Sequence, residues 1–228
     1  MTWTRRQLSQ HTSGLFGHTE ALPLDPAAFP SIRYKAWDPR ELVAIGTSRP
    51  LGFESGTQHS YSSTNYVVAG LLIEKITGRP YHQAVAQRIL KPLHLKDTSL
   101  PRNSVDIPGP HAHGYFPYMN GKPVDVTRLN PSWGWAAGEM ISTTGGLDMF
   151  LAALPEGKLL KPAQQRELTK TTAVSPNYGI GVSVTPLSLH HDRRQRRHHS
   201  RLCSDGGRRL RQVAGKGVLL GKTKGELG

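Results

Sequence analysis

The sequence predicts a mixed α/β chain of the α+β type, with helices around an antiparallel sheet. Three observations predict this class. Several segments repeat apolar residues at helical spacing between clear start and stop signals. Two short segments, 111–115 and 122–126, flank an Asn-Gly turn that is typical of a hairpin. A later segment, 178–184, alternates apolar with small residues, as a strand with one buried face does.

The first helices are defined by their ends. Residues 3–10 form a short amphipathic segment that runs into the turn His11–Gly14. Asp38 precedes Pro39, and a glutamate follows three residues after the aspartate, so a helix is expected to begin there with a capping box. A longer helix is expected from Ser62 or Ser63, either of which can cap it, to Gly78.

Later elements follow the same kinds of signal. A helix over 81–90 is expected to end against a proline, and a second is expected from the caps at 142–144 to about residue 154. Pro162 opens a further helix to about residue 170. After Ser188 no periodicity remains, so neither a strand nor a helix is predicted there.

Composition predicts two unequal parts. Apolar residues make up only 36% of the 228, beside 24 Gly and 17 Pro, so part of the chain is expected not to fold. Residues 1–188 hold 18 Lys and Arg against 13 Asp and Glu, whereas residues 189–228 hold 11 against 3. We therefore predict a folded domain over 1–188 and a basic, disordered or frameshifted tail over 189–228.

The tail has two interpretations. Abrupt replacement of patterned sequence by Arg, His, Gly and Leu is what a reading-frame shift in a GC-rich gene would produce. The second interpretation is a genuine basic arm that binds nucleic acid or a membrane surface. Charge alone, however, supplies only salt-sensitive, non-specific binding. Nucleic acid is therefore not the expected partner.

Cysteine content, hydropathy and histidine spacing argue against several classes of protein. The single cysteine, Cys203, excludes an internal disulfide framework. No apolar run of signal-peptide length opens the chain and no window approaches a membrane span, so the chain as written is expected to be soluble and cytoplasmic. His111 and His113 lack a third ligand at a plausible spacing, so neither a metal nor another cofactor is expected.

The most informative segment is the polar turn 58–66, which leads directly into an apolar helix. Tyr61 lies on this turn, and a phenol held at the base of a helix can relay a proton. Its alternative role is that of a core aromatic at the entrance of the helix. Ser13, beside His11, could similarly act as a nucleophile, but a hydroxyl that stabilises its turn is expected instead.

Four motifs carry a family resemblance. They are Thr12-Ser13-Gly14-Leu15, the run from Tyr61 to Glu74, the run from Pro92 to Thr98, and the run from Ala136 to Thr143. Together, over residues 2–188, the chain resembles the beta-lactamase-related serine hydrolases. It is most similar to secreted D-alanyl-D-alanine carboxypeptidases, with class C beta-lactamases and related esterases next.

The resemblance implies a beta-lactamase/transpeptidase-like fold, an antiparallel sheet flanked by helices with a helical second lobe. It implies acyl transfer through a serine ester on D-alanyl peptides, beta-lactams or esters, without a cofactor, in proteins that are usually secreted or periplasmic. A Ser-x-x-Lys motif, a Tyr-x-Asn motif and a Lys-Thr-Gly or His-x-Gly motif build such a site, and backbone amides polarise the carbonyl.

The resemblance transfers only in part. Tyr61 matches the family tyrosine, which is expected to relay a proton to the leaving group, and Ser63 stands where the family has asparagine. Trp133 matches an aromatic that lines the cleft and contacts substrate; its alternative is a tryptophan half-buried on a loop.

The other two motifs are absent. No lysine has a serine three positions before it, and no histidine has a glycine two positions after it. Both losses resemble truncation, so several strands of the sheet are expected to be missing and the chain is expected to fold poorly alone. The prediction is therefore a serine hydrolase by family that is inactive as this chain. The alternatives are a non-catalytic fragment that binds ligand weakly and, more distantly, a basic nucleic-acid-binding arm.

Overall fold

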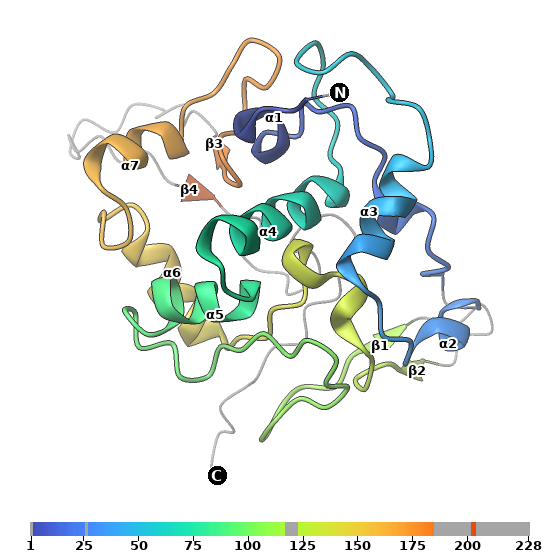
Figure 1. The fold of residues 1–228 in the computed structure, drawn as a ribbon. Helices are drawn as coiled ribbons and strands as arrows, with labels where there is room; N and C mark the ends of the chain where they lie inside the picture. Colours follow the sequence, from blue (N-terminus) through green and yellow to red (C-terminus); the bar gives the residue numbers. More distant parts are fainter. Residues whose placement is uncertain (1, 26, 117–122, 185–201, 204–228) are drawn as a thin grey trace, which may run out of the picture.

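The computed structural model describes residues 2–25, 27–116, 123–184 and 202–203. Figure 1 shows a mainly helical molecule in which helix α4 crosses the centre, with α1, α3 and α5 packed around it. The helices are α1 (Arg5–Ser9), α2 (Phe29–Ile32), α3 (Pro39–Thr47), α4 (Ser63–Thr77), α5 (Tyr81–Val85), α6 (Thr144–Ala153) and α7 (Pro162–Leu168). Short helical turns are η1 (His18–Glu20), η2 (Ala86–Leu90), η3 (Pro131–Trp133) and η4 (Trp135–Ala137).

The predicted helix starts at α3 and α6 are confirmed. Asp38 accepts the amide hydrogen of Arg40 at 2.7 Å, and the side chain of Glu41 accepts the amide hydrogen of Asp38 in return. Thr143 caps α6 by accepting from the amide of Gly146 at 3.0 Å. These contacts involve neighbours in sequence, which is why local signals were sufficient to find them.

Helix α4 confirms its predicted span but not its predicted cap. It begins at Ser63 and ends where Gly78 adopts the left-handed conformation, with φ of 64°. Neither Ser62 nor Ser63 caps it with a side chain, so that prediction is wrong. The hydroxyl of Ser63 instead bonds to His18, a residue 45 positions away, because the start of α4 is buried against segment 11–19.

Helices α3 and α4 cross at a glycine. A side-chain carbon at Gly46 would collide with the side chain of Thr64, so the backbones can approach this closely only without one. Leu42 and Val67, on the facing sides of the two helices, are completely buried. This contact fixes the first turn of α4, where the predicted site residues lie.

The two sheets are small. Strand β1 (Tyr115–Phe116) pairs antiparallel with β2 (Val124–Asp125), which confirms the predicted pairing, although 111–113 are not in a strand and 117–122 lie outside the described residues. Phe29, Val126 and Leu129 form a buried cluster beside this sheet.

The second sheet differs from the sequence-based prediction in two ways. Only Ser183–Val184 of the predicted strand 178–184 forms β3, because 178–182 turn back on themselves with a hydrogen bond from the amide of Gly179 to the carbonyl of Val182. Strand β4 (Leu202–Cys203) pairs antiparallel with β3, whereas no strand was expected after Ser188. The rest of the predicted tail, 189–201 and 204–228, lies outside the described residues.

Candidate active site

Tyr61 lies two residues before the start of α4. About 36% of its surface is exposed, and its ring lies against the imidazole of His11 with ring centres 4.3 Å apart and planes 36° apart. The tyrosine that the sequence singled out therefore has one covered face and one accessible side. The covering residue comes from the turn after α1, 50 positions earlier in the chain.

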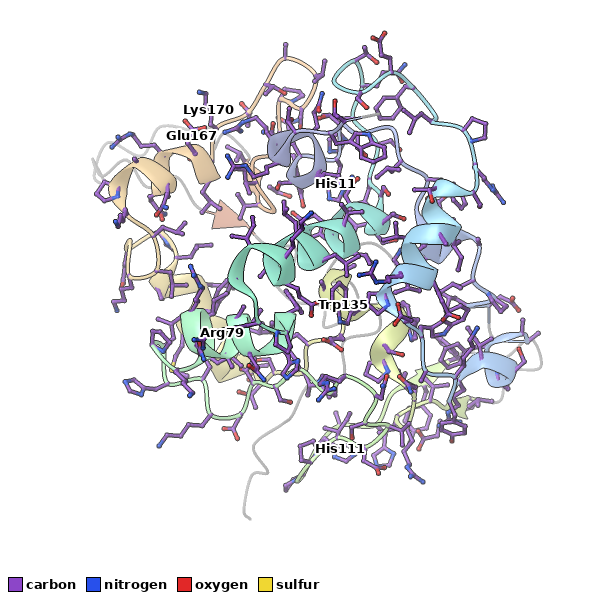
Figure 2. All side chains as sticks on the ribbon, in the orientation of Figure 1. His11, Arg79, His111, Trp135, Glu167 and Lys170 are labelled. Carbon is purple, nitrogen blue, oxygen red and sulfur yellow. The ribbon has the colours of Figure 1, made fainter. Side chains whose placement is uncertain are left out.

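His11 is completely buried. Figure 2 shows it between α1 and the first turn of α4. Its Nδ1 accepts a hydrogen bond from the backbone amide of Ser62 at 3.2 Å and lies 3.3 Å from the amide nitrogen of Asn65. Because Nδ1 is the acceptor, the proton of the neutral ring is on Nε2. That Nε2 has no hydrogen-bond partner among the described residues.

A buried polar chain supports the imidazole. The hydroxyl of Ser13 donates to Oδ1 of Asn65 at 2.6 Å, and the amide of Leu15 donates to the Ser13 oxygen at 3.1 Å. Asn65 is thereby oriented with its nitrogen toward His11. Ser13 stabilises its turn, as the sequence predicted, and its hydroxyl is fully engaged.

The phenol of Tyr61 and the imidazole of His11 are both neutral at physiological pH. Burial, and then the neighbouring Tyr178, raise the pKa of Tyr61 to about 12. Burial, and then the neighbouring His59, lower the pKa of His11 to about 4. Tyr61 therefore stays protonated and can donate a hydrogen bond, although its phenol is a weaker acid than a free one.

Ser63 is buried two residues further along. Its oxygen lies 3.2 Å from Nδ1 of His18 and 3.0 Å from the hydroxyl of Thr19. On the other side of the ring, Nε2 of His18 donates to the backbone carbonyl of Trp133 at 2.9 Å. His18 therefore accepts from Ser63 at Nδ1, and burial lowers its pKa. One neutral imidazole joins two of the predicted site residues.

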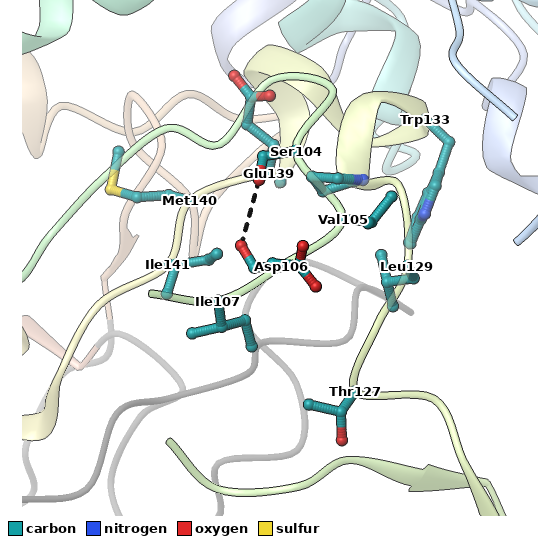
Figure 3. A pocket seen from close by; sticks show the side chains of 12 residues that line it. Ser104, Val105, Asp106, Ile107, Thr127, Leu129, Trp133, Glu139, Met140 and Ile141 are labelled. Atoms are coloured by element: carbon teal, nitrogen blue, oxygen red, sulfur yellow. Dashed lines mark hydrogen bonds between the residues drawn. The ribbon is translucent and has the colours of Figure 1, made fainter. Parts of the chain in front are cut away.

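Trp133 is buried, with 7% of its surface exposed, and is thus not a half-exposed loop residue. Figure 3 shows it on one side of a small cavity of about 30 Å³, opposite Met140 and Ile141. Its indole nitrogen has no partner within the described part of the chain.

Glu139 also lines this cavity. It lies within the run from Ala136 to Thr143, but the sequence did not single it out as a site residue. It is 3% exposed, and neither carboxylate oxygen meets a hydrogen-bond partner among the residues described. Burial raises its pKa to about 7, opposed by the nearby Arg102. An isolated acid inside an apolar and small-residue motif was the available sequence signal.

The structure brings the site together through residues that sequence reasoning did not assign to it. His11 and Asn65 hold the turn of Tyr61, and His18 joins Ser63 to Trp133. Asn65 lies inside one of the quoted motifs and His11 directly before another, but the sequence assigned neither residue a role in the site. In the described ranges no group of three or more potential ligands could hold a metal ion. Nor does any helix placed by the structure have the length and apolar character of a membrane span.

Solved structures share this architecture. A D-stereospecific amidohydrolase from a Streptomyces species is 42% identical over 81% of this chain and 57% of its own, with a TM-score of 0.76. The D-amino acid amidase of Ochrobactrum anthropi SV3, solved with L-phenylalanine amide, is 28% identical over 81% of this chain and 54% of its own, with a TM-score of 0.68.

A Bacillus subtilis protein named as a penicillin-binding protein, PbpX, is 29% identical over 82% of the chain and 44% of its own length. The chain thus spans about half the length of each of these three proteins. These likenesses confirm the predicted beta-lactamase/transpeptidase-like fold. The family model described as Beta-lactamase matches residues 2–225, and the chain belongs to that family.

Proposed function

We propose that this chain carries the tyrosine side of an acyl-transfer site for amides and peptides of D-amino acids. The observation that carries the proposal is the neutral Tyr61, held by His11 at the start of α4 with one side accessible. The 42% identity to a D-stereospecific amidohydrolase supports this substrate class over a simple ester.

The residues divide the work. The phenol of Tyr61 donates a hydrogen bond to the bound ligand, and its high pKa keeps it protonated for that role. Trp133 supplies an apolar wall, while the Ser63 hydroxyl, already bonded to His18, supports that wall more than it contacts substrate. A longer asparagine at this position would reach further than this serine.

Turnover requires a nucleophile, and the sequence contains no Ser-x-x-Lys. Ser13, two residues after His11, already donates its hydroxyl hydrogen to Asn65. We therefore propose that these 228 residues bind ligand without forming an acyl-enzyme.

Two measurements on the purified chain test this. Titration with D-phenylalanine amide, followed by NMR, should show binding that Tyr61→Phe weakens about fivefold, the value of one lost hydrogen bond. L-Phenylalanine amide is the control for stereochemistry, and Tyr34→Phe, at an exposed tyrosine, is the control variant.

Fluorescent penicillin provides the second measurement. No label should remain after denaturation, because no serine ester forms. A retained label would show that a serine in this chain is nucleophilic, and equal binding of amide by wild type and Tyr61→Phe would remove Tyr61 from the site.

A further inference from the structure

The turn after α1 is attached to the turn before α4 by a set of buried polar contacts. Besides the contacts to Nδ1 of His11, the carbonyl of His11 accepts from the amide of Ser60 at 2.9 Å. His11 thus bonds to the residues on both sides of Tyr61. Backbone groups bonded in this way at both neighbours leave the intervening residue little freedom.

The same side chain also contacts the Tyr61 ring itself. The edge of the imidazole receives the Ser62 amide, while its face lies 4.3 Å from the centre of the tyrosine ring. One residue therefore constrains both the backbone and the side-chain direction of Tyr61. Its own backbone is in the left-handed region, with φ of 55°, a conformation that few residues other than glycine adopt and for which histidine is among the better suited.

We infer that His11 is a positioning residue for Tyr61, acting as a neutral imidazole fixed in the Nε2–H tautomer. The inference deepens the proposed function, on which it rests for the role of Tyr61. It concerns a residue that touches the tyrosine and not the substrate.

The charges around His11 are consistent with this tautomer. The titratable groups that face its ring are His59, Tyr61, Tyr66 and Tyr178, with centres 4.3 to 6.1 Å away. No carboxylate is among these ring neighbours, so none of them forms an ion pair with a positive imidazole. A proton on Nδ1 would also replace the lone pair that receives the Ser62 amide.

The first test needs no variant. Long-range proton–nitrogen NMR correlation distinguishes a protonated ring nitrogen from a bare one. His11 should show a bare Nδ1 and a protonated Nε2 from pH 8 down to pH 5. A proton on Nδ1, or a charged ring at pH 6, would overturn the inference.

The second test uses matched variants. In His11→Asn the side-chain oxygen takes approximately the place of Nδ1, and asparagine tolerates positive φ well. In His11→Gln the carboxamide reaches the place of Nε2, so the Ser62 amide loses its acceptor. His59→Gln is the control, because it alters a neighbouring imidazole whose ring centre is 6.1 Å from that of His11.

The readouts are the amide proton shift of Ser62 and the ionisation of Tyr61, assigned by comparison with Tyr61→Phe. In His11→Gln the Ser62 amide proton should move to the chemical shift of an amide without a hydrogen-bond acceptor. The pKa of Tyr61 should fall toward the ordinary value of about 10. His11→Asn should give values between those of His11→Gln and wild type. His59→Gln should leave the Ser62 shift unchanged. A folded His11→Gln with both readouts as in wild type would overturn the inference.

These readouts need no ligand, so the two proposals can fail separately. If the chain binds no amide but the pKa of Tyr61 still changes when His11 is replaced, the proposed function is removed and the positioning role is kept. Binding that depends on Tyr61 but not on His11 would do the reverse.

Discussion

At the residue scale, the site uses histidine as an uncharged connector. His11 and His18 are both completely buried, and each accepts a hydrogen bond at Nδ1 from a group beside α4. A neutral imidazole can accept a hydrogen bond without the desolvation cost of a buried charge, and that of His18 also donates at its other nitrogen. This explains how two segments more than 40 residues apart are joined without an ion pair.

Asn65 is the residue on which this arrangement can be tested most directly. Asn65→Leu keeps a similar volume but leaves the Ser13 hydroxyl without its acceptor and removes a donor from His11. We expect a loss of about 1–3 kcal/mol in the free energy of unfolding, measured by urea denaturation. Asn103→Leu, at an exposed position, should change it by less than about 0.5 kcal/mol. Equal effects of the two variants would contradict the role of Asn65.

At the scale of elements, the helices were predictable and much of the sheet was not. The capping box of α3 and the glycine end of α4 depend on residues within four positions of one another. Strand β3 depends on pairing with β4, 19 residues away, so its extent was predicted wrongly. The site followed the same rule: Tyr61 lies in a local motif, whereas His18 meets Trp133 across 115 residues.

The crossing of α3 and α4 yields a prediction of its own. Gly46→Ala would press a methyl group onto Thr64, whose hydroxyl donates to the carbonyl of Phe16 and accepts from the amide of His18. Because that side chain cannot turn away freely, we expect a loss of about 1–3 kcal/mol of stability by thermal denaturation.

Gly145→Ala provides the matched control, since nothing lies within 4 Å of the new carbon on α6. Helix propensity alone should make that variant about 0.5–1 kcal/mol more stable than wild type. The interpretation of the crossing fails if Gly46→Ala is stabilising in the same way.

At the scale of the whole molecule, two buried groups give opposite responses to pH. The pKa of His11 is lowered to about 4, so the unfolded chain takes up this proton first and acidification from pH 6.5 to 4 destabilises the fold. The pKa of Glu139 is raised to about 7, so the folded chain takes up that proton first and acidification from pH 7 to 4.5 stabilises it. The two contributions largely cancel.

Replacing the acid should expose the histidine contribution. Between pH 6.5 and 4 we expect the free energy of unfolding of Glu139→Gln to fall by about 3 kcal/mol more than that of wild type, from 1.36 kcal/mol per pKa unit. Glu156→Gln, in a surface pair with Lys158, is the control and should parallel wild type. Urea titrations across this pH range measure the stability of all three proteins. A Glu139→Gln profile parallel to that of wild type would show that Glu139 does not offset the effect of His11.

The central position of α4 also bears on the order in which the molecule folds. The contacts that hold its first turn join Ser62 to His11 across 51 residues, and the His18 contact to Trp133 spans 115. Closing such long loops is entropically costly, so contacts of this kind form late compared with those inside a helix. We therefore expect the helices to form before Tyr61 is in place, which makes the geometry of the tyrosine a product of the completed fold and not of the residues around it in sequence.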